Sequence, residues 1–60
     1  MSYVVGFQIN YQAYDGWRRE TYAETVEAND EDGARIIAGG LMAASLADGE
    51  TATLTAIMAR

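Results

Sequence analysis

Cysteine, histidine and lysine are all absent from this sixty-residue sequence. Without cysteine no disulfide can form, and without cysteine or histidine a structural zinc site lacks its usual ligands. So short a chain buries a small share of its surface and needs an added source of stability. Disulfides and a zinc site, the two common ways to stabilise a small fold, are both missing. Oligomerisation is the remaining source of stability, so we expect a homodimer.

The same absences limit the chemistry. Nucleophilic catalysis requires a base beside the nucleophile, and no histidine, cysteine or lysine is present to activate Ser2 or Ser45. Carboxylate pairs such as Glu20 and Glu24 remain, but acid–base catalysis requires a cleft that shifts a pKa, and so small a fold has little room for one. The acidic segment NDEDG lacks two carboxylates of a calcium-binding EF-hand loop. We therefore expect no enzyme, no metal and no cofactor.

Positive charge is also scarce, since the chain has four arginines and nine acidic residues and its net charge is −5. Nonspecific binding to phosphates requires clustered positive charge, so direct nucleic-acid binding is not expected. Long-range attraction favours a partner that is itself basic. A solvated acidic surface that aids solubility is the alternative interpretation.

No apolar run is long enough to cross a membrane. The longest, Ile36 to Ala47, falls short of the approximately 20 residues that a spanning helix requires. The opening Met1-Ser2-Tyr3 has no basic stretch or cleavage site of a secretory signal. These features predict a soluble, cytoplasmic protein with no membrane partner.

Alternating apolar residues from Tyr3 to Tyr14 predict a strand with one buried face. Asp15-Gly16 then favours a two-residue type I′ turn, and a second strand returns from Trp17 to Ala28. That turn would pair Tyr14 with Trp17, and would set Ile9 opposite Tyr22 and Val5 opposite Val26. It would also place Glu20 and Glu24 on the apolar face, at the rim of an edge strand. A longer turn, with the register slipped by one residue, is the alternative.

A helix is predicted from Glu31 to Leu46, ending at Asp48-Gly49, where glycine can adopt the left-handed conformation. Asp30 is the expected N-cap, and Glu31 and Asp32 fall in the first turn, where acids are favoured. Beyond Arg35 the helix has no charge, so it carries more apolar surface than one sheet can cover. Gly39-Gly40 weakens the helix. The pair either allows close approach by another chain, or packs closely on the protein's own sheet, or is only a tolerated weakness.

Thr51 to Ala59 predicts a third strand, in which Ala52, Leu54, Ala56 and Met58 alternate with three threonines and Ile57. The expected fold is a single α+β domain, residues 1–60, with element order ββαβ. It has a three-stranded antiparallel sheet in the order 2-1-3 and one helix packed on one face. The third strand carries no charge that would discourage pairing with another chain. The expected dimer contacts are therefore of two kinds, on the helix or on this edge: Ile36, Gly40, Ala43, Thr53 and Thr55.

Two clusters are candidate recognition surfaces. The first is the hairpin tip, where Tyr14, Trp17 and Arg18 are of the types enriched at binding hot spots. In the alternative interpretation, Tyr14 and Trp17 only stack across the turn. The second is an acidic band that could present carboxylates to a basic groove: Glu20, Glu24, Glu27, Asp30, Glu31 and Asp32.

In size, charge and element order the chain resembles small acidic phage-encoded inhibitors that mimic DNA, such as uracil-DNA glycosylase inhibitors. No motif of that family matches residue by residue, so none of its functional residues is assigned here. The resemblance implies a protein-binding inhibitor of a host DNA-binding enzyme, located in the host cytoplasm. A structural or assembly protein whose role is self-association is the competing hypothesis.

Overall fold

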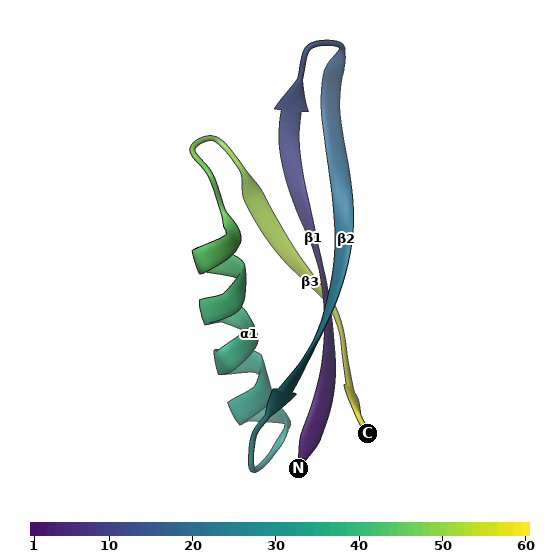
Figure 1. Cartoon of the computed structure of the whole chain (residues 1–60), viewed down its shortest axis with the longest axis vertical. Coiled ribbons are helices and arrows are strands. Elements are labelled where there is room, and N and C mark those ends of the chain that lie inside the picture. The colour runs from purple at the N-terminus through teal and green to yellow at the C-terminus, as the bar shows by residue number, and fades with distance from the viewer.

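A computed structural model describes all residues, 1–60, as two long strands, a helix and a third strand. Strand β1 spans Ser2–Ala13, β2 spans Gly16–Glu27, helix α1 spans Glu31–Ser45 and β3 spans Thr51–Ala59. The sheet is antiparallel with the order β2-β1-β3, and α1 lies on one face (Figure 1). The predicted α+β fold class, element order and strand order are confirmed.

The hairpin register differs from the predicted one by two residues. Ala13 pairs with Gly16, so the two-residue loop is Tyr14-Asp15 rather than Asp15-Gly16. A type I′ turn needs positive φ at both central residues, and no residue other than glycine has positive φ here. Gly16, with φ of 128°, instead begins β2. The carboxylate of Asp15 accepts two hydrogen bonds from Arg18, at 3.2 and 2.5 Å.

A shift of two residues keeps every side chain on its predicted face, because successive residues alternate. The partners change: Ile9 lies opposite Glu20 and Val5 opposite Glu24, while Phe7 lies opposite Tyr22. The helix side of β2 therefore carries exposed carboxylates at the rim of an edge strand. The predicted pairs of Ile9 with Tyr22 and of Val5 with Val26 are wrong.

A bulge in β3 changes which of its residues face the helix. Gly6 pairs with Ala56 and Phe7 pairs with Leu54, so Thr55 is an extra residue in β3. Leu54 and Ile57 consequently both pack against the core, although they are three residues apart. A Cβ atom at Gly6 would lie only 3.1 Å from Thr55 Oγ1, so glycine makes room for the bulge. The predicted strict alternation through Ile57 and Met58 is wrong for this reason.

Helix α1 begins as predicted and ends earlier. Asp30 is the N-cap and accepts a hydrogen bond of 2.8 Å from the Gly33 amide. The last helical residue is Ser45, and Leu46 caps the helix in an extended conformation. Gly49, with φ of 81°, belongs to the separate turn that leads into β3. Helix α1 falls short of the length and apolar character needed to span a membrane.

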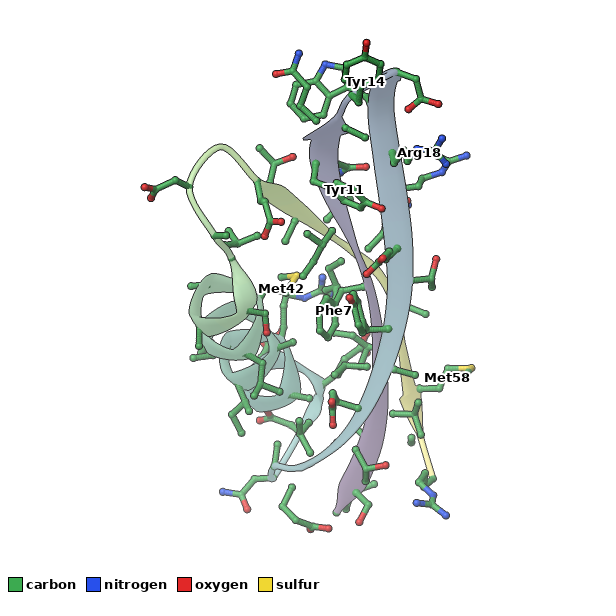
Figure 2. All side chains as sticks on the ribbon, turned by 45° about the horizontal axis from the view of Figure 1, so that its top comes forward. Phe7, Tyr11, Tyr14, Arg18, Met42 and Met58 are labelled. Carbon is green, nitrogen blue, oxygen red and sulfur yellow. The ribbon has the colours of Figure 1, made fainter.

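The core lies between α1 and the part of the sheet around Val5 and Val26. Its central cluster joins Val5, which is fully buried, to two alanines of the helix: the members are Tyr3, Val5, Val26, Ala34 and Ala38. Because the helix contacts the sheet through alanines, its backbone sits close to the strands. Figure 2 shows Phe7 and Met42 between α1 and the sheet, while Met58 points away from the helix.

The core is small for the chain. Only 7 of the 60 residues are buried, and Val26 is the only buried residue of β2. The hairpin formed by β1 and β2 extends beyond both α1 and β3 (Figure 1), and the molecule measures 41 × 17 × 13 Å. The helix therefore leaves much of β2 uncovered.

Candidate functional site

A groove runs between the C-terminal end of α1 and the uncovered side of β2. It consists of two adjoining hollows of about 350 and 230 Å³, which share Ile9, Tyr22 and Ser45. We call it the β2 groove and define it by the residues that line it: Phe7, Ile9, Tyr11, Glu20, Tyr22, Glu24, Ser45 and Glu50.

The period of two along the strands assembles the groove. Glu20, Tyr22 and Glu24 alternate along β2 and so point to the same face as Phe7 and Ile9 of β1. Phe7 and Ile9 are buried and form an apolar floor. The rings of Phe7 and Tyr22 stack with centroids 5.6 Å apart, which fixes Tyr22 beside the carboxylates.

Carboxylates set the electrostatics of the groove. The Tyr22 hydroxyl donates a hydrogen bond to Glu20, and this bond is the main cause that raises the pKa of Tyr22 above its usual value. Partial desolvation and the charges of Glu20 and Glu50 raise this pKa further. Glu50 is held in place because one of its carboxylate oxygens accepts a hydrogen bond of 2.8 Å from the Ala47 amide. The field in the groove is therefore negative.

The nearby arginines are engaged elsewhere. Arg18 pairs with Asp15 at 2.5 Å, and this interaction lowers the pKa of the Asp15 carboxyl. Arg35 lies 3.6 Å from Glu31, four residues before it on the helix. No arginine lines either hollow of the groove, and Glu24 takes part in none of the three ion pairs of the structure.

The predicted acidic band does not form one surface. Only Glu20 and Glu24 lie in the β2 groove. Glu27 is on the opposite face of the sheet, where it accepts a hydrogen bond from Ser2 and lies 3.7 Å from the N-terminal amine. The other three acids are at the start of the helix, where Asp30 is the N-cap, Glu31 pairs with Arg35, and Asp32 lies in the first turn.

The predicted hairpin tip is exposed but divided between faces. Tyr14 lies in the turn and is fully exposed (Figure 2), while Trp17 pairs with Gln12 on the side of the sheet away from the helix. They are therefore not partners in the ladder. Arg18 lies on the helix side, opposite Tyr11, next to the β2 groove.

The predicted dimer residues occupy two separate surfaces. Ile36, Gly40 and Ala43 are exposed on the side of α1 away from the sheet, and Ile36 is 77% exposed. Thr53 and Thr55 are exposed on β3, and Thr55 is the bulged residue.

Several groove residues are absent from the predicted sets. Tyr11 and Tyr22 could have been found, because their alternation with Glu20 and Glu24 places them on the same face. Ser45 and Glu50 could not, because their position beside β2 depends on how the helix crosses the sheet.

The coupling of Tyr22 to Glu20 predicts a pH response. Replacing Glu20→Gln should lower the pKa of Tyr22, because the charge that disfavours tyrosinate is removed. The fold favours the neutral phenol, so this stabilisation is complete below the unfolded-state pKa and is lost as the pH rises through the folded-state pKa. Carbon-13 NMR of ring-labelled tyrosine, with Tyr22→Phe for assignment, measures it.

The matched control is Glu27→Gln, which removes the same charge on the opposite face of the sheet. It should leave the pKa of Tyr22 unchanged. An equal pKa shift in both variants would show that general charge, and not the contact with Glu20, governs Tyr22.

No three acidic side chains lie close enough together to hold a metal ion. The groove thus offers carboxylate oxygens, phenol hydroxyls and an apolar floor, a set suited to a cationic side chain. The sequence matches no family model and no curated protein, and the structure matches no solved structure.

Proposed function

We propose that this protein is a cytoplasmic, non-enzymatic binding module whose β2 groove receives a basic segment of a partner protein. The observation that carries the proposal is the joint presence of Glu20, Glu24 and Glu50 around an apolar, aromatic floor, with no arginine in the lining. The hydrogen bond from the Tyr22 hydroxyl to Glu20 supports it, because it holds one of these carboxylates at the groove.

An arginine or lysine side chain of the partner fits each part of the groove. Its charged end pairs with Glu20 or Glu24, and a guanidinium forms two parallel hydrogen bonds to one carboxylate. The faces of Tyr11 and Tyr22 attract a cation. The aliphatic stem of the side chain packs in the hollow lined by Ile9, Tyr11 and Tyr22.

For the partner we propose a host DNA-binding enzyme, which the protein inhibits. Such enzymes carry basic surfaces for phosphate, and a negative groove on a chain of net charge −5 is complementary to them. The resemblance in size, charge and element order to small phage-encoded inhibitors supports the same choice.

Charge reversal tests the groove. The double variant Glu20→Lys, Glu24→Lys should lose capture of a basic partner from host lysate, at least tenfold by quantitative mass spectrometry, because two attractive contacts become repulsive. The free energy of unfolding should change little, since both side chains are exposed.

The matched control is Asp32→Lys, Asp48→Lys, which changes the net charge equally at two exposed acids outside the groove. It should retain capture. Equal loss in both double variants would show that total charge acts, and full capture by the groove variant would refute the groove as the contact. A purified partner enzyme should lose DNA cleavage or base excision when the unmodified protein is added.

The second candidate function is an assembly module whose task is self-association. The observation that favours it is the exposed apolar side of α1, where Ile36 is 77% exposed. An assembly module gives higher oligomers at raised concentration and no stoichiometric host partner, whereas an inhibitor gives one defined complex.

A further inference from the structure

The outer edge of β2 carries a row of free backbone hydrogen-bonding groups. Met1 and Ala28 exchange two hydrogen bonds of 3.0 Å, and in an antiparallel ladder such pairs alternate with pairs that exchange none. Along the register, the even-numbered residues of β2 therefore bond to β1, and the odd-numbered ones, from Trp17 to Thr25, turn their N–H and C=O groups outward. Strand β2 has no neighbour on that side, and no backbone hydrogen bond outside the ladders involves it.

This edge is long, regular and open. Strand β2 pairs with β1 over 12 residues without a bulge, and every residue of β2 except Val26 is exposed. The other free edge of the sheet, on β3, is interrupted by the bulge at Thr55. Because a regular free edge is a template for pairing with a further strand, the edge of β2 is the better acceptor of the two.

The carboxylates of the groove determine which strand fits there. Glu20 and Glu24 lie on the same face of β2, on either side of Tyr22, and four residues of a strand span about 13 Å. Opposite charges in directly opposed positions stabilise a pair of strands, and like charges destabilise it. A second copy of this chain offers only Arg18 on this face of β2, and Arg18 already donates two hydrogen bonds to Asp15. The edge is therefore complementary to a basic strand from another protein.

We propose that the basic segment of the partner binds as an extended strand, antiparallel to β2 along its outer edge. This inference rests on the proposed function and specifies how the β2 groove receives its partner. Two basic residues of the segment, four apart, lie opposite Glu24 and Glu20, and an apolar residue midway between them lies opposite Tyr22. These three pairs exchange no backbone hydrogen bonds, so their side chains are at the closest cross-strand distance.

The residues between those three supply the backbone contacts. They lie opposite Ala23 and Thr21, whose outward N–H and C=O groups each exchange two hydrogen bonds with them. In strand addition, main-chain bonds give affinity and alternate side chains give specificity. A helical segment would leave the edge unused, because its own N–H and C=O groups are already paired within the helix.

A synthetic peptide tests this geometry on the unmodified protein. It has nine residues, with arginine at the third and seventh positions, valine at the fifth and threonine elsewhere. Methylating the backbone nitrogens of its fourth and sixth residues should weaken binding about tenfold or more by calorimetry, because these two N–H groups bond to Ala23 and Thr21. The matched control carries its two methyl groups on the fifth and seventh nitrogens. Those nitrogens point away from β2, so the control should bind like the unmethylated peptide.

A second test changes the edge and keeps both carboxylates. Ala23→Pro removes one outward N–H group, and proline is tolerated at an edge strand where its nitrogen faces solvent. It should weaken binding of the unmethylated peptide about tenfold, while the helix content by circular dichroism is kept. Ala23→Val is the control, because it adds similar bulk at the same exposed position and keeps the N–H group. It should bind the peptide normally.

The outcomes separate this inference from the proposed function. Equal binding of all three peptides would overturn strand addition, and so would failure of the unmethylated peptide to bind at millimolar concentration. Either result would leave the groove to be judged by the capture experiment with Glu20→Lys, Glu24→Lys, which depends on the carboxylates alone. Selective weakening by methyl groups on the fifth and seventh nitrogens would mean a parallel strand and would also overturn the antiparallel arrangement.

Discussion

Replacing Phe7→Ala is expected to remove a large share of the free energy of unfolding. Phe7 is 3% exposed and stacks on Tyr22. The substitution therefore removes a large buried ring and also the stacking contact with Tyr22. Truncating a buried phenylalanine typically costs about 3 to 5 kcal/mol. A sixty-residue chain has a total stability of roughly 3 to 9 kcal/mol, so the variant should lose a large share of it and its urea midpoint should fall strongly. Urea titration followed by circular dichroism measures this.

Met58→Ala is the matched control, because it removes a side chain of similar size from the same sheet. Met58 is 60% exposed and points away from the helix (Figure 2). Its truncation should change the free energy of unfolding by about 0.5 kcal/mol or less. A cooperative transition of normal midpoint in Phe7→Ala would show that the groove floor contributes little to the fold.

The second large effect is expected at the contact between helix and sheet. Ala38→Leu should lower the free energy of unfolding by about 1 to 3 kcal/mol, through overpacking. Ala38 is fully buried in the central cluster with Val5 and Ala34, so the added carbon atoms must force the helix away from the strands. The urea midpoint should fall while the slope of the transition stays the same.

At the adjacent position, Gly39, we expect the free energy of unfolding to change in the opposite direction. Gly39→Leu adds a leucine where a Cβ atom meets nothing within 4 Å. It should raise the free energy of unfolding by up to about 1 kcal/mol, because leucine is a better helix former than glycine. A stability loss at both positions would mean that leucine is unfavourable throughout this helix, and the argument from overpacking would fail.

The elements of the fold could be predicted because their signals are local. The alternation from Tyr3 onward and the acids at the start of the helix are each read within a few residues, and the structure bears both out. The faces of the strands also follow from local alternation, so the rim position of Glu20 and Glu24 was predictable even though their partners were not.

The register and the bulge depend on long-range competition. The residue types of Asp15-Gly16 are those favoured in a type I′ turn, which requires positive φ at both positions. Asp15 instead has a negative φ, and its carboxylate accepts a hydrogen bond from Arg18. The bulge at Thr55 depends on what Gly6 leaves open in the neighbouring strand. No pattern within β3 alone indicates it.

The candidate site was predictable only in part. Clustering along the chain suggested one acidic band, but a strand and a helix start point their side chains in different directions. Glu27 and Asp30 therefore lie outside the groove. Glu27 pairs with the N-terminal amine, and Asp30 caps the helix. Glu50 joins the groove from a distant loop, and only the crossing of the helix over the sheet brings it there.

The projecting end of the hairpin has a consequence for how this protein is observed. The pairing of β3 with β1 stops at Asn10, so the residues from Tyr11 to Arg18 are held only by one another. Their amide protons should exchange with solvent through local opening, at a lower free energy than the amides near Val5. Trp17, the single tryptophan, lies in this segment and is 64% exposed. Its fluorescence therefore reports fraying of the hairpin end, while circular dichroism reports loss of the helix, and the two signals from one chain describe different events.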